Sequence, residues 1–382
     1  MNVIYIMNEH YPYGMAATMR VKLFAEFLVN HHHHVNILIS NQDNGDNAKS
    51  GINNGVKYST LYKVKKPVLV YLLVYPFIVF YKLLLLKQKN IMNILIIYSG
   101  VNLFNLQFMI FGKLLGYKIV IDAVEDNISS SEEMKILSRL NIKITEMILP
   151  YIGKFIDGVT VISMKLLEKY QLLYKDHQIK LLPISAANIN LIYKKSTKNA
   201  KLKFVYAGSY GKKDGVTILI DAFNILSKKY PEIQLLLLGK ITTGLSERIQ
   251  LLKNINIIQL GYLDEKNYWI NLSEADILCM TRIDSPYANA GFPFKLGEYL
   301  ATRNPVIVTD ISDVKDYLTD KKDCLMAKPS DKGSLIDAME YLIENPEVRE
   351  LIGNNGYEKC IQFFNPEING KILLNYLLNI SK

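Results

Sequence analysis

The sequence of 382 residues has few cysteines and none of the usual metal-binding patterns. Cys279, Cys324 and Cys360 lie far apart, without a CxxC pair, and there is no Asp-x-Asp pair. This spacing excludes a disulfide framework and a cysteine-based zinc site, and it indicates reduced thiols in the cytoplasm. Four consecutive histidines, at positions 31–34, lie between a helix-like and a strand-like segment. We interpret them as a junction, and we expect neither a metal nor a cofactor.

Acidic residues are missing from a long part of the first half. None occurs between Asp46 and Asp122, although the whole chain has a net charge of +9. This gap contains the basic and apolar segment 63–89, whose uncharged run spans residues 67–81. The run is shorter than the roughly 20 apolar residues that a membrane-spanning helix needs. Two interpretations stay open: a segment lying on an anionic membrane surface, or a buried helix with ordinary lysine flanks.

Other partners and targeting signals have little support. The chain lacks interleaved basic and aromatic residues and any recognisable nucleic-acid module, so no nucleic acid partner is expected. Its first residues have no basic stretch ahead of an apolar one, which is typical of a first β-strand and not of a signal peptide. We therefore expect a cytoplasmic protein, peripheral on the inner face of the cell membrane.

Strand-like and helix-like segments alternate through most of the chain. The alternation is interrupted by a polar, irregular stretch at residues 185–200 and then restarts. Alternation with apolar strands predicts parallel sheets covered by helices on both faces. We therefore predict two Rossmann-like α/β domains, 1–187 and 188–365, with parallel sheets that face each other across a cleft. Ligands of such sheets bind beyond the carboxyl ends of the strands.

The motif AGFPFKLGEYLA, residues 290–301, predicts an anion site at the start of a helix. Gly291 permits close backbone approach, and Pro293 suits a helix entry. Free N–H groups at a helix start attract phosphate, yet Lys295 places a positive charge there, where the helix dipole prefers an acid. Glu298 lies one turn later on the same face and is suited to ribose hydroxyls. The alternative is an ordinary exposed Lys–Glu pair.

A second strand–loop–helix turn, YAGSYGKKDG, spans residues 206–215. Gly208 ends the strand, and Lys212 and Lys213 precede the next helix, an arrangement suited to a diphosphate. The turn matches neither GxGxxG nor a P-loop, so a nicotinamide or ATP site is not indicated. A solvated basic turn is the alternative. Gly14 lies in the first strand-to-helix loop and would face these two loops across the cleft.

These motifs together resemble the C-terminal domain of glycosyltransferase family 4, whose members are retaining enzymes of the GT-B fold. The resemblance covers residues 203–364 well and the first half more loosely. It implies that residues 366–382 form a last helix that crosses back to the N-terminal domain. It also implies that Glu298 holds the nucleotide ribose, that Lys213 binds phosphate and that Gly14 lets the diphosphate approach. The further donor contacts that it implies are Tyr262, Leu263, Gly291, Phe292, Pro293 and Phe294.

Three positions depart from the pattern of that family. Ala290, with Asn289 beside it, stands where the family has a glutamate eight residues before Glu298. Ser209 replaces a phosphate-contacting arginine. Glu125 stands where a histidine is common, and there it would orient the sugar or the acceptor. We nevertheless count Asn289, Ala290 and Ser209 among the expected donor contacts, and Glu125 among the expected catalytic residues.

The resemblance implies transfer of a sugar from a nucleotide-diphosphate sugar to a lipid-linked or surface-polysaccharide acceptor. Helix starts, together with Lys213 and Lys295, would stabilise the departing diphosphate by preorganised electrostatics. Two alternatives stay open, a nucleotide-sugar 2-epimerase and a non-catalytic subunit that binds nucleotide sugar and scaffolds an assembly complex.

Overall fold

The computed structural model describes residues 1–40, 47–61, 68–103, 105–126, 136–175, 177–189 and 201–380. The chain divides into two compact units, Met1–Ser185 with Pro366–Lys382, and Ala186–Asn365. The second unit thus begins at Ala186, slightly before the boundary at residue 188 that the sequence suggested. Residues 190–200, where the polar stretch ends, lie outside the described residues, as do residues 62–67 at the start of the basic apolar segment.

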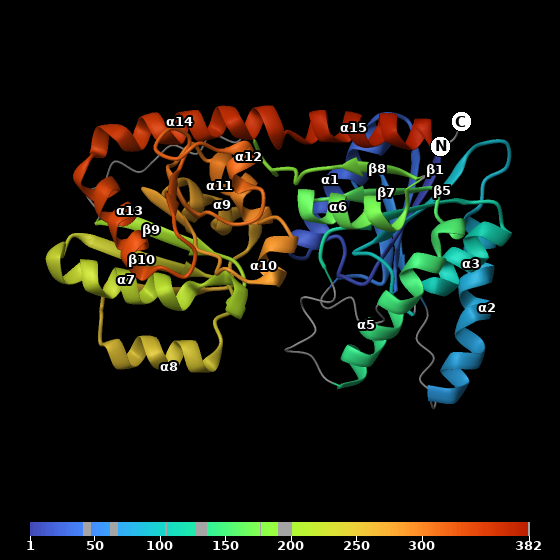
Figure 1. The fold of residues 1–382 in the computed structure, drawn as a ribbon, viewed down its shortest axis with the longest axis horizontal. Helices are drawn as coiled ribbons and strands as arrows, with labels where there is room; N and C mark the ends of the chain where they lie inside the picture. Colours follow the sequence, from blue (N-terminus) through green and yellow to red (C-terminus); the bar gives the residue numbers. More distant parts are fainter. Residues whose placement is uncertain are drawn as a thin grey trace. The chain divides into compact units, whose positions relative to one another are not determined.

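The first unit is an eight-stranded sheet with helices, shown mainly in blue and green in Figure 1. Its strand order is β3-β4-β2-β1-β5-β6-β7-β8. The strands are β1 (Asn2–Met7), β2 (His34–Ile39), β3 (Ser50–Asn53), β4 (Val56–Thr60), β5 (Asn93–Tyr98), β6 (Lys118–Ala123), β7 (Gly158–Val161) and β8 (Gln178–Leu181). The helices are α1 (Ala16–Asn30), α2 (Val68–Leu86), α3 (Leu106–Leu114), α5 (Ile136–Ile148), α6 (Met164–Leu173) and α15 (Pro366–Asn379), with two 3-10 turns at Leu149–Tyr151 and Gly153–Phe155.

The first sheet is parallel, as the alternation predicted, except at one edge. All neighbouring strands in it are parallel except β3, which runs antiparallel to β4. The two strands are joined by Asn54 and Gly55, which have φ values of 45° and 79°. An Asn-Gly pair with positive φ favours a two-residue hairpin whose twist matches that of the strands. The polar segment that ends at Gly55 therefore contains β3, and β4 follows it.

The C-terminal helix α15 belongs to the first unit. Asn369 donates a hydrogen bond of 2.8 Å to the carbonyl of Ile184, and Tyr376 donates one of 2.7 Å to the carbonyl of Gln178. A Cβ atom at Gly370 would lie 2.3 Å from the ring of Phe27 on α1. Glycine is thus needed where the two helices approach closely.

The second unit contains a six-stranded, fully parallel sheet with the order β11-β10-β9-β12-β13-β14. Its strands are β9 (Leu202–Ala207), β10 (Ile233–Leu238), β11 (Ile257–Gly261), β12 (Ile277–Met280), β13 (Val306–Thr309) and β14 (Leu325–Ala327). Its helices are α7 (Val216–Lys229), α8 (Thr243–Leu252), α9 (Glu265–Ser273), α10 (Pro286–Ala290), α11 (Phe294–Ala301), α12 (Val314–Tyr317), α13 (Lys332–Glu344) and α14 (Pro346–Phe363), with a 3-10 turn at Lys212–Asp214.

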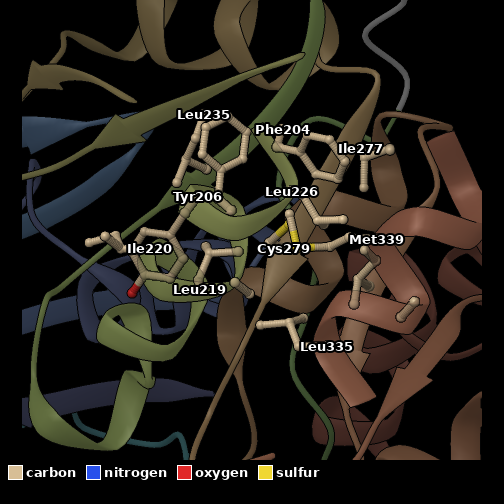
Figure 2. Packing of buried hydrophobic residues seen from close by; sticks show 14 of the residues in the cluster. Phe204, Tyr206, Leu219, Ile220, Leu226, Leu235, Ile277, Cys279, Leu335 and Met339 are labelled. Carbon is tan, nitrogen blue, oxygen red and sulfur yellow. The ribbon is translucent and has the colours of Figure 1, made fainter. Parts of the chain in front are cut away.

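The core of the second unit lies between this sheet and helices α7 and α13. Figure 2 shows Phe204 of β9, Leu235 of β10 and Cys279 of β12 packed with Leu226 of α7 and Met339 of α13. All five are essentially inaccessible to solvent. Phe204, Val205, Tyr206 and Ala207 follow one another along β9 and are all buried, so both faces of the strand are covered up to its carboxyl end. The short elements β14 and α10 were not expected from the sequence.

Candidate functional site

The candidate site is built at the carboxyl end of β9, where the strand passes into the next loop. Gly208 has a φ of 142°, and its N–H donates a 3.0 Å hydrogen bond to the carbonyl of Leu238. A Cβ atom at Gly208 would lie 2.7 Å from the Nζ atom of Lys295. The backbone conformation therefore favours glycine, and any other residue would displace the Lys295 side chain. The Lys295 ammonium lies directly against this strand end.

The loop after β9 closes with a 3-10 turn and Gly215, which precedes α7. Gly215 has a φ of 63°, and a Cβ atom there would lie 1.9 Å from the carbonyl oxygen of Thr281. The turn places the Lys213 Nζ atom 3.2 Å from the Tyr287 hydroxyl and 4.3 Å from the centre of its ring. Lys213 is thereby held by a cation–π contact. Lys212, in contrast, is exposed.

A buried polar network surrounds Lys295 on the first turn of α11. Its Nζ atom donates to the Tyr206 hydroxyl at 2.8 Å and lies 3.4 Å from Asp214 Oδ1. Ser209 donates a 2.6 Å hydrogen bond to Asp214 Oδ2. Burial lowers the pKa of Lys295 to about 8, although Asp214 opposes this effect. The site thus contains an ammonium group whose charge depends on its neighbours.

Asp214 is 2 % exposed and remains an acid of low pKa. Burial alone would raise the pKa of this carboxyl. The charge of Lys295, the hydrogen bond from Ser209 and the charge of Arg282 together outweigh burial and lower it. Within the described residues, the Asp214 carboxylate is therefore the anion that pairs with Lys295 at this helix start.

Glu298 lies one turn after Lys295 on α11, and Tyr268 of α9 donates a 2.7 Å hydrogen bond to its Oε2 atom. Burial raises the pKa of Glu298 to about 7, although the hydrogen bond from Tyr268 and the charge of Lys295 act in the opposite direction. The carboxyl can therefore accept hydrogen bonds as an anion or donate one as an acid near neutral pH.

The loop before α11 is held by contacts within the unit. Asn289 donates a 2.7 Å hydrogen bond to Asp284 and accepts one of 3.1 Å from the backbone N–H of Ser312. The side chain of Ala290 is fully buried. The structure thus gives Asn289 a role in holding the loop, and the methyl group of Ala290 contributes to the core.

The next four residues form the entry to the helix. Pro293 is the N-cap of α11 with a φ of −72°. Phe292 is buried, with its ring 5.2 Å from Tyr317 and 5.7 Å from Phe364 between centroids. Gly291 and Phe294 are buried as well. The aromatic contacts fix the path of the backbone, so this loop can contribute N–H groups and close approach more readily than side chains.

Tyr262 and Leu263 follow the edge strand β11. Tyr262 is 78 % exposed, and Leu263 is half-buried. Within the described residues, neither forms a hydrogen bond with the Lys295 network, although both follow a strand whose carboxyl end lies at the same edge of the sheet as that of β9.

Gly14 and Glu125 belong to the first unit and follow β1 and β6, which are both parallel to β5. Carboxyl ends of parallel strands meet at one edge of a sheet, so both residues lie at that edge. A Cβ atom at Gly14 would lie 2.1 Å from Thr18 Oγ1, which itself donates a 2.6 Å hydrogen bond to the carbonyl of His10. Glu125 is exposed.

Below this edge lies a buried ion pair that the sequence did not suggest. Arg20 of α1 donates two hydrogen bonds of 2.9 Å to the carboxylate of Asp122 on β6. Its guanidinium also donates to the carbonyls of Pro183 and Leu182, and Thr160 donates to Asp122 at 2.8 Å. Each nitrogen of the guanidinium and each oxygen of the carboxylate thus has a hydrogen-bond partner, as buried charges require. It ties α1 to the strand that precedes Glu125.

The structure thus brings Gly208, Ser209, Lys213, Lys295 and Glu298 to one end of the second sheet. Sequence reasoning missed the residues that hold these groups in place. The signal for one of them was present, because Asp214 directly follows Lys213. The missed residues are Tyr206, Asp214, Tyr268, Arg282 and Tyr287. In the part of the chain that the structure describes, no group of three or more His, Cys, Asp or Glu side chains is arranged to hold a metal ion.

Residues 188–359 match the family model described as Glycosyl transferases group 1. The capsular polysaccharide biosynthesis glycosyltransferase CapM of Staphylococcus aureus is 24% identical over 167 residues, which are 43% of this chain and 42% of that protein. The match spans about two fifths of the length of the curated relatives.

Solved structures of other proteins are similar to this one over the whole chain. Sucrose-phosphate synthase from Thermosynechococcus elongatus has a TM-score of 0.77 at 16% identity, with 100% of both chains covered. Alr3699/HepE from Anabaena, solved in complex with UDP, has a TM-score of 0.71 at 14% identity and covers 99% of this chain and 100% of its own. The chain therefore has the GT-B fold, and its second unit matches the group 1 glycosyl transferases.

Proposed function

We propose that this protein is a retaining glycosyltransferase that moves a sugar from a nucleotide-diphosphate sugar to a glycan or lipid-linked glycan acceptor. The observation that carries the proposal is the cluster of Lys213, Lys295 and Glu298 at the carboxyl end of β9 and the start of α11. The cluster lies inside the region that matches the glycosyltransferase family model. A GT-B neighbour of similar length was solved with UDP, which is consistent with a nucleotide donor.

The chemistry asks the protein to stabilise a departing diphosphate. The bond between the anomeric carbon and the phosphate oxygen breaks, and a bond to the acceptor oxygen forms on the same face of the sugar. The acceptor's proton passes to an oxygen of the leaving diphosphate. Lys213 and Lys295 supply positive charge to that group, and the N–H groups at the start of α11 add their dipoles. Glu298 accepts hydrogen bonds from ribose hydroxyls, and Glu125 orients the sugar or the acceptor.

A thermal-shift panel with UDP, GDP, ADP and CMP tests the donor site. A ligand at 100 times its dissociation constant stabilises the folded state by about 2.7 kcal/mol. We expect one nucleoside diphosphate to raise the melting temperature of the wild type, and Lys213→Gln and Glu298→Ala to reduce the shift. Lys228→Gln, which removes an exposed lysine of α7, is the matched control and should keep it. No shift with any nucleotide would overturn the proposal.

Product analysis distinguishes a glycosyltransferase from a nucleotide-sugar 2-epimerase and from a non-catalytic scaffold subunit. With donor and a lipid-linked glycan acceptor, a glycosyltransferase forms a longer glycan and releases the nucleoside diphosphate. An epimerase converts the nucleotide sugar without any acceptor. A scaffold subunit binds the nucleotide sugar and changes neither substrate.

We further propose that the first unit binds an anionic membrane surface through α2 and α3. The membrane would hold the lipid to which the acceptor glycan is linked. Within the described residues, no helix has the length and apolar character needed to cross a membrane. Helix α2 buries Tyr75, Val79 and Leu83 but exposes Phe77 by 76 % and Tyr81 by 60 %. Helix α3 packs beside it, with Phe80 and Phe111 in edge contact, as Figure 1 shows for the two helices.

The charge around these helices complements an anionic surface. Leu114 of α3 is 73 % exposed, and Lys87 and Lys89 at the end of α2 line a surface hollow with Lys118. The sequence has no acidic residue between Asp46 and Asp122. Apolar side chains and lysines in this arrangement favour insertion into the interface with the lysines on lipid phosphates.

Flotation with phosphatidylglycerol-containing and neutral phosphatidylcholine vesicles tests this surface. We expect the wild type to float with anionic vesicles, and Phe77→Ser/Leu114→Ser to remain unbound. The control, Leu251→Ser/Ile255→Ser, removes two equally exposed apolar side chains from the second unit and should float as the wild type does. Equal flotation of both double variants, or none by the wild type, would contradict the membrane proposal.

A further inference from the structure

The Lys295 ammonium is held from two sides by groups far away in the sequence. It lies over the Tyr206 ring, 4.2 Å from its centre, and donates to that residue's hydroxyl. On the other side it pairs with Asp214, whose second oxygen accepts the hydrogen bond from Ser209. Both carboxylate oxygens of Asp214 therefore have a partner at the end of β9. The Lys295 side chain is 13 % exposed.

This arrangement bears on the missing arginine at position 209. A serine cannot supply the positive charge that the resemblance places there. The Lys295 ammonium lies beside the end of the same strand: a Cβ atom on Gly208, the residue before Ser209, would be 2.7 Å from it. Ser209 is bonded to the carboxylate that pairs with Lys295. Ser209 therefore helps to hold the Asp214 carboxylate that pairs with Lys295.

We propose that Asp214 is a positioning residue that keeps Lys295 charged and aimed at the end of β9, and that this pair replaces the arginine missing at position 209 in binding the donor's diphosphate. The inference rests on the proposed function for the ligand. The pairing of Asp214 with Lys295 does not depend on it.

The groups around Lys295 define what Asp214 does. Burial disfavours the charged ammonium, and the nearby positive charges of Arg282 and Lys213 disfavour it further. Asp214 acts in the opposite direction, and the Glu298 carboxyl lies one turn away on the same helix. With Asp214 neutralised, two cations and burial remain, so the Lys295 pKa falls below its value of about 8. The lysine then loses its charge within the neutral range.

The first test reads the pair without any ligand. Reductive methylation with ¹³C-formaldehyde gives each lysine an NMR signal whose shift titrates with its ammonium, and Lys295→Arg identifies the signal of residue 295. We expect that signal to titrate at a clearly lower pH in Asp214→Asn than in the wild type. Asp221→Asn, which removes one carboxylate from the surface of α7, should leave it in place. An unchanged titration in Asp214→Asn would overturn the inference.

The second test reads the role of the pair in binding, with UDP as the probe and its dissociation constant measured from pH 6 to pH 9. We expect wild-type affinity to weaken above about pH 8, and the affinity of Asp214→Asn to weaken at lower pH. If the Lys295 pKa falls by about one unit, the charged fraction at pH 7.5, and with it the affinity, falls about threefold. Asp214→Asn/Lys295→Arg should recover affinity, because arginine stays charged.

The two tests fail in distinguishable ways. If Asp214→Asn shifts the lysine titration but the wild type does not bind UDP, the proposed donor is wrong and the ion-pair part of the inference stands. If UDP binds with the same pH profile in the wild type and Asp214→Asn, or if arginine at position 295 restores nothing, Asp214 has no positioning role. The fluorescence of Trp269, the single tryptophan, reports whether each variant is folded.

Discussion

The buried carboxyl of Glu298 makes the stability of the second unit depend on pH in a defined direction. Its folded pKa is raised by burial to about 7 from an ordinary value of 4.5. The folded state therefore holds a proton that the unfolded state releases, so stability is complete below pH 4.5 and is lost as the pH rises through 7. Between pH 5 and pH 7, linkage gives a loss of about 2 kcal/mol from this group. Glu298→Gln, which keeps an acceptor for Tyr268, should remove that loss.

Urea unfolding followed by Trp269 fluorescence measures this effect in the second structural unit, which contains Glu298. Trp269 lies on α9 beside Tyr268 and is 4 % exposed, so its emission reports the packing around Glu298. The difference in unfolding free energy between the wild type and Glu298→Gln should change by about 2 kcal/mol from pH 5 to pH 7. The pKa of Lys295 is about 8, so its titration leaves this range largely untouched.

Glu247→Gln, on the exposed surface of α8, controls for the loss of a carboxylate. Its unfolding free energy should run parallel to that of the wild type across the range. If Glu298→Gln also runs parallel, the Glu298 carboxyl is not desolvated as its position on α11 implies, and the reasoning fails. A dependence of the opposite sign would mean that the charged form is the stabilised one.

Three further outcomes follow from the packing. Arg20→Leu, which leaves Asp122 buried without its partner, should destabilise the first unit by about 3–5 kcal/mol in urea unfolding, and an unchanged midpoint would contradict this. Gly215→Ala should cost clearly more than Gly261→Ala, because both have positive φ but only at Gly215 would the Cβ atom meet backbone; equal melting temperatures would contradict that difference. Thiol reagents should label the buried cysteines only when the second unit unfolds, and rapid labelling of the native protein would contradict their burial. These cysteines are Cys279, Cys324 and Cys360.

Much of the fold could be predicted from local patterns. The apolar runs of β1, β5, β9 and β10 are surrounded by turn residues and helical segments, and this alternation predicts parallel sheets regardless of distant contacts. The hairpin of β3 and β4 was not predicted, although Asn54 and Gly55 signal it, because the segment that leads up to this pair is polar and lacks an apolar strand pattern. The short strand β14 and the short helix α10 have too few residues for a pattern to separate them from loop.

The positions of Lys295 and Glu298 at a helix start could be read from the sequence, because a Gly-Phe-Pro entry and a spacing of one turn are local properties. Which groups would surround them could not be read. The sequence suggested that an anion must accompany Lys295; the structure supplies Asp214, which is 81 positions away. Tyr268 lies 30 positions from Glu298, and Arg20 lies 102 from Asp122.

The sequence by itself determined most of the strand and helix order, the two-part organisation and the acid-free segment before β6, since each depends on neighbours along the chain. Tertiary structure decided the charge state of the site. The pKa values of Lys295 and Glu298 depend on burial and on charges brought close by folding of the sheet, and these distances exist only once β9, α9 and α11 have packed together. The protonation states of Lys295 and Glu298 therefore depend on the packed second unit, through residues that lie far apart in the sequence.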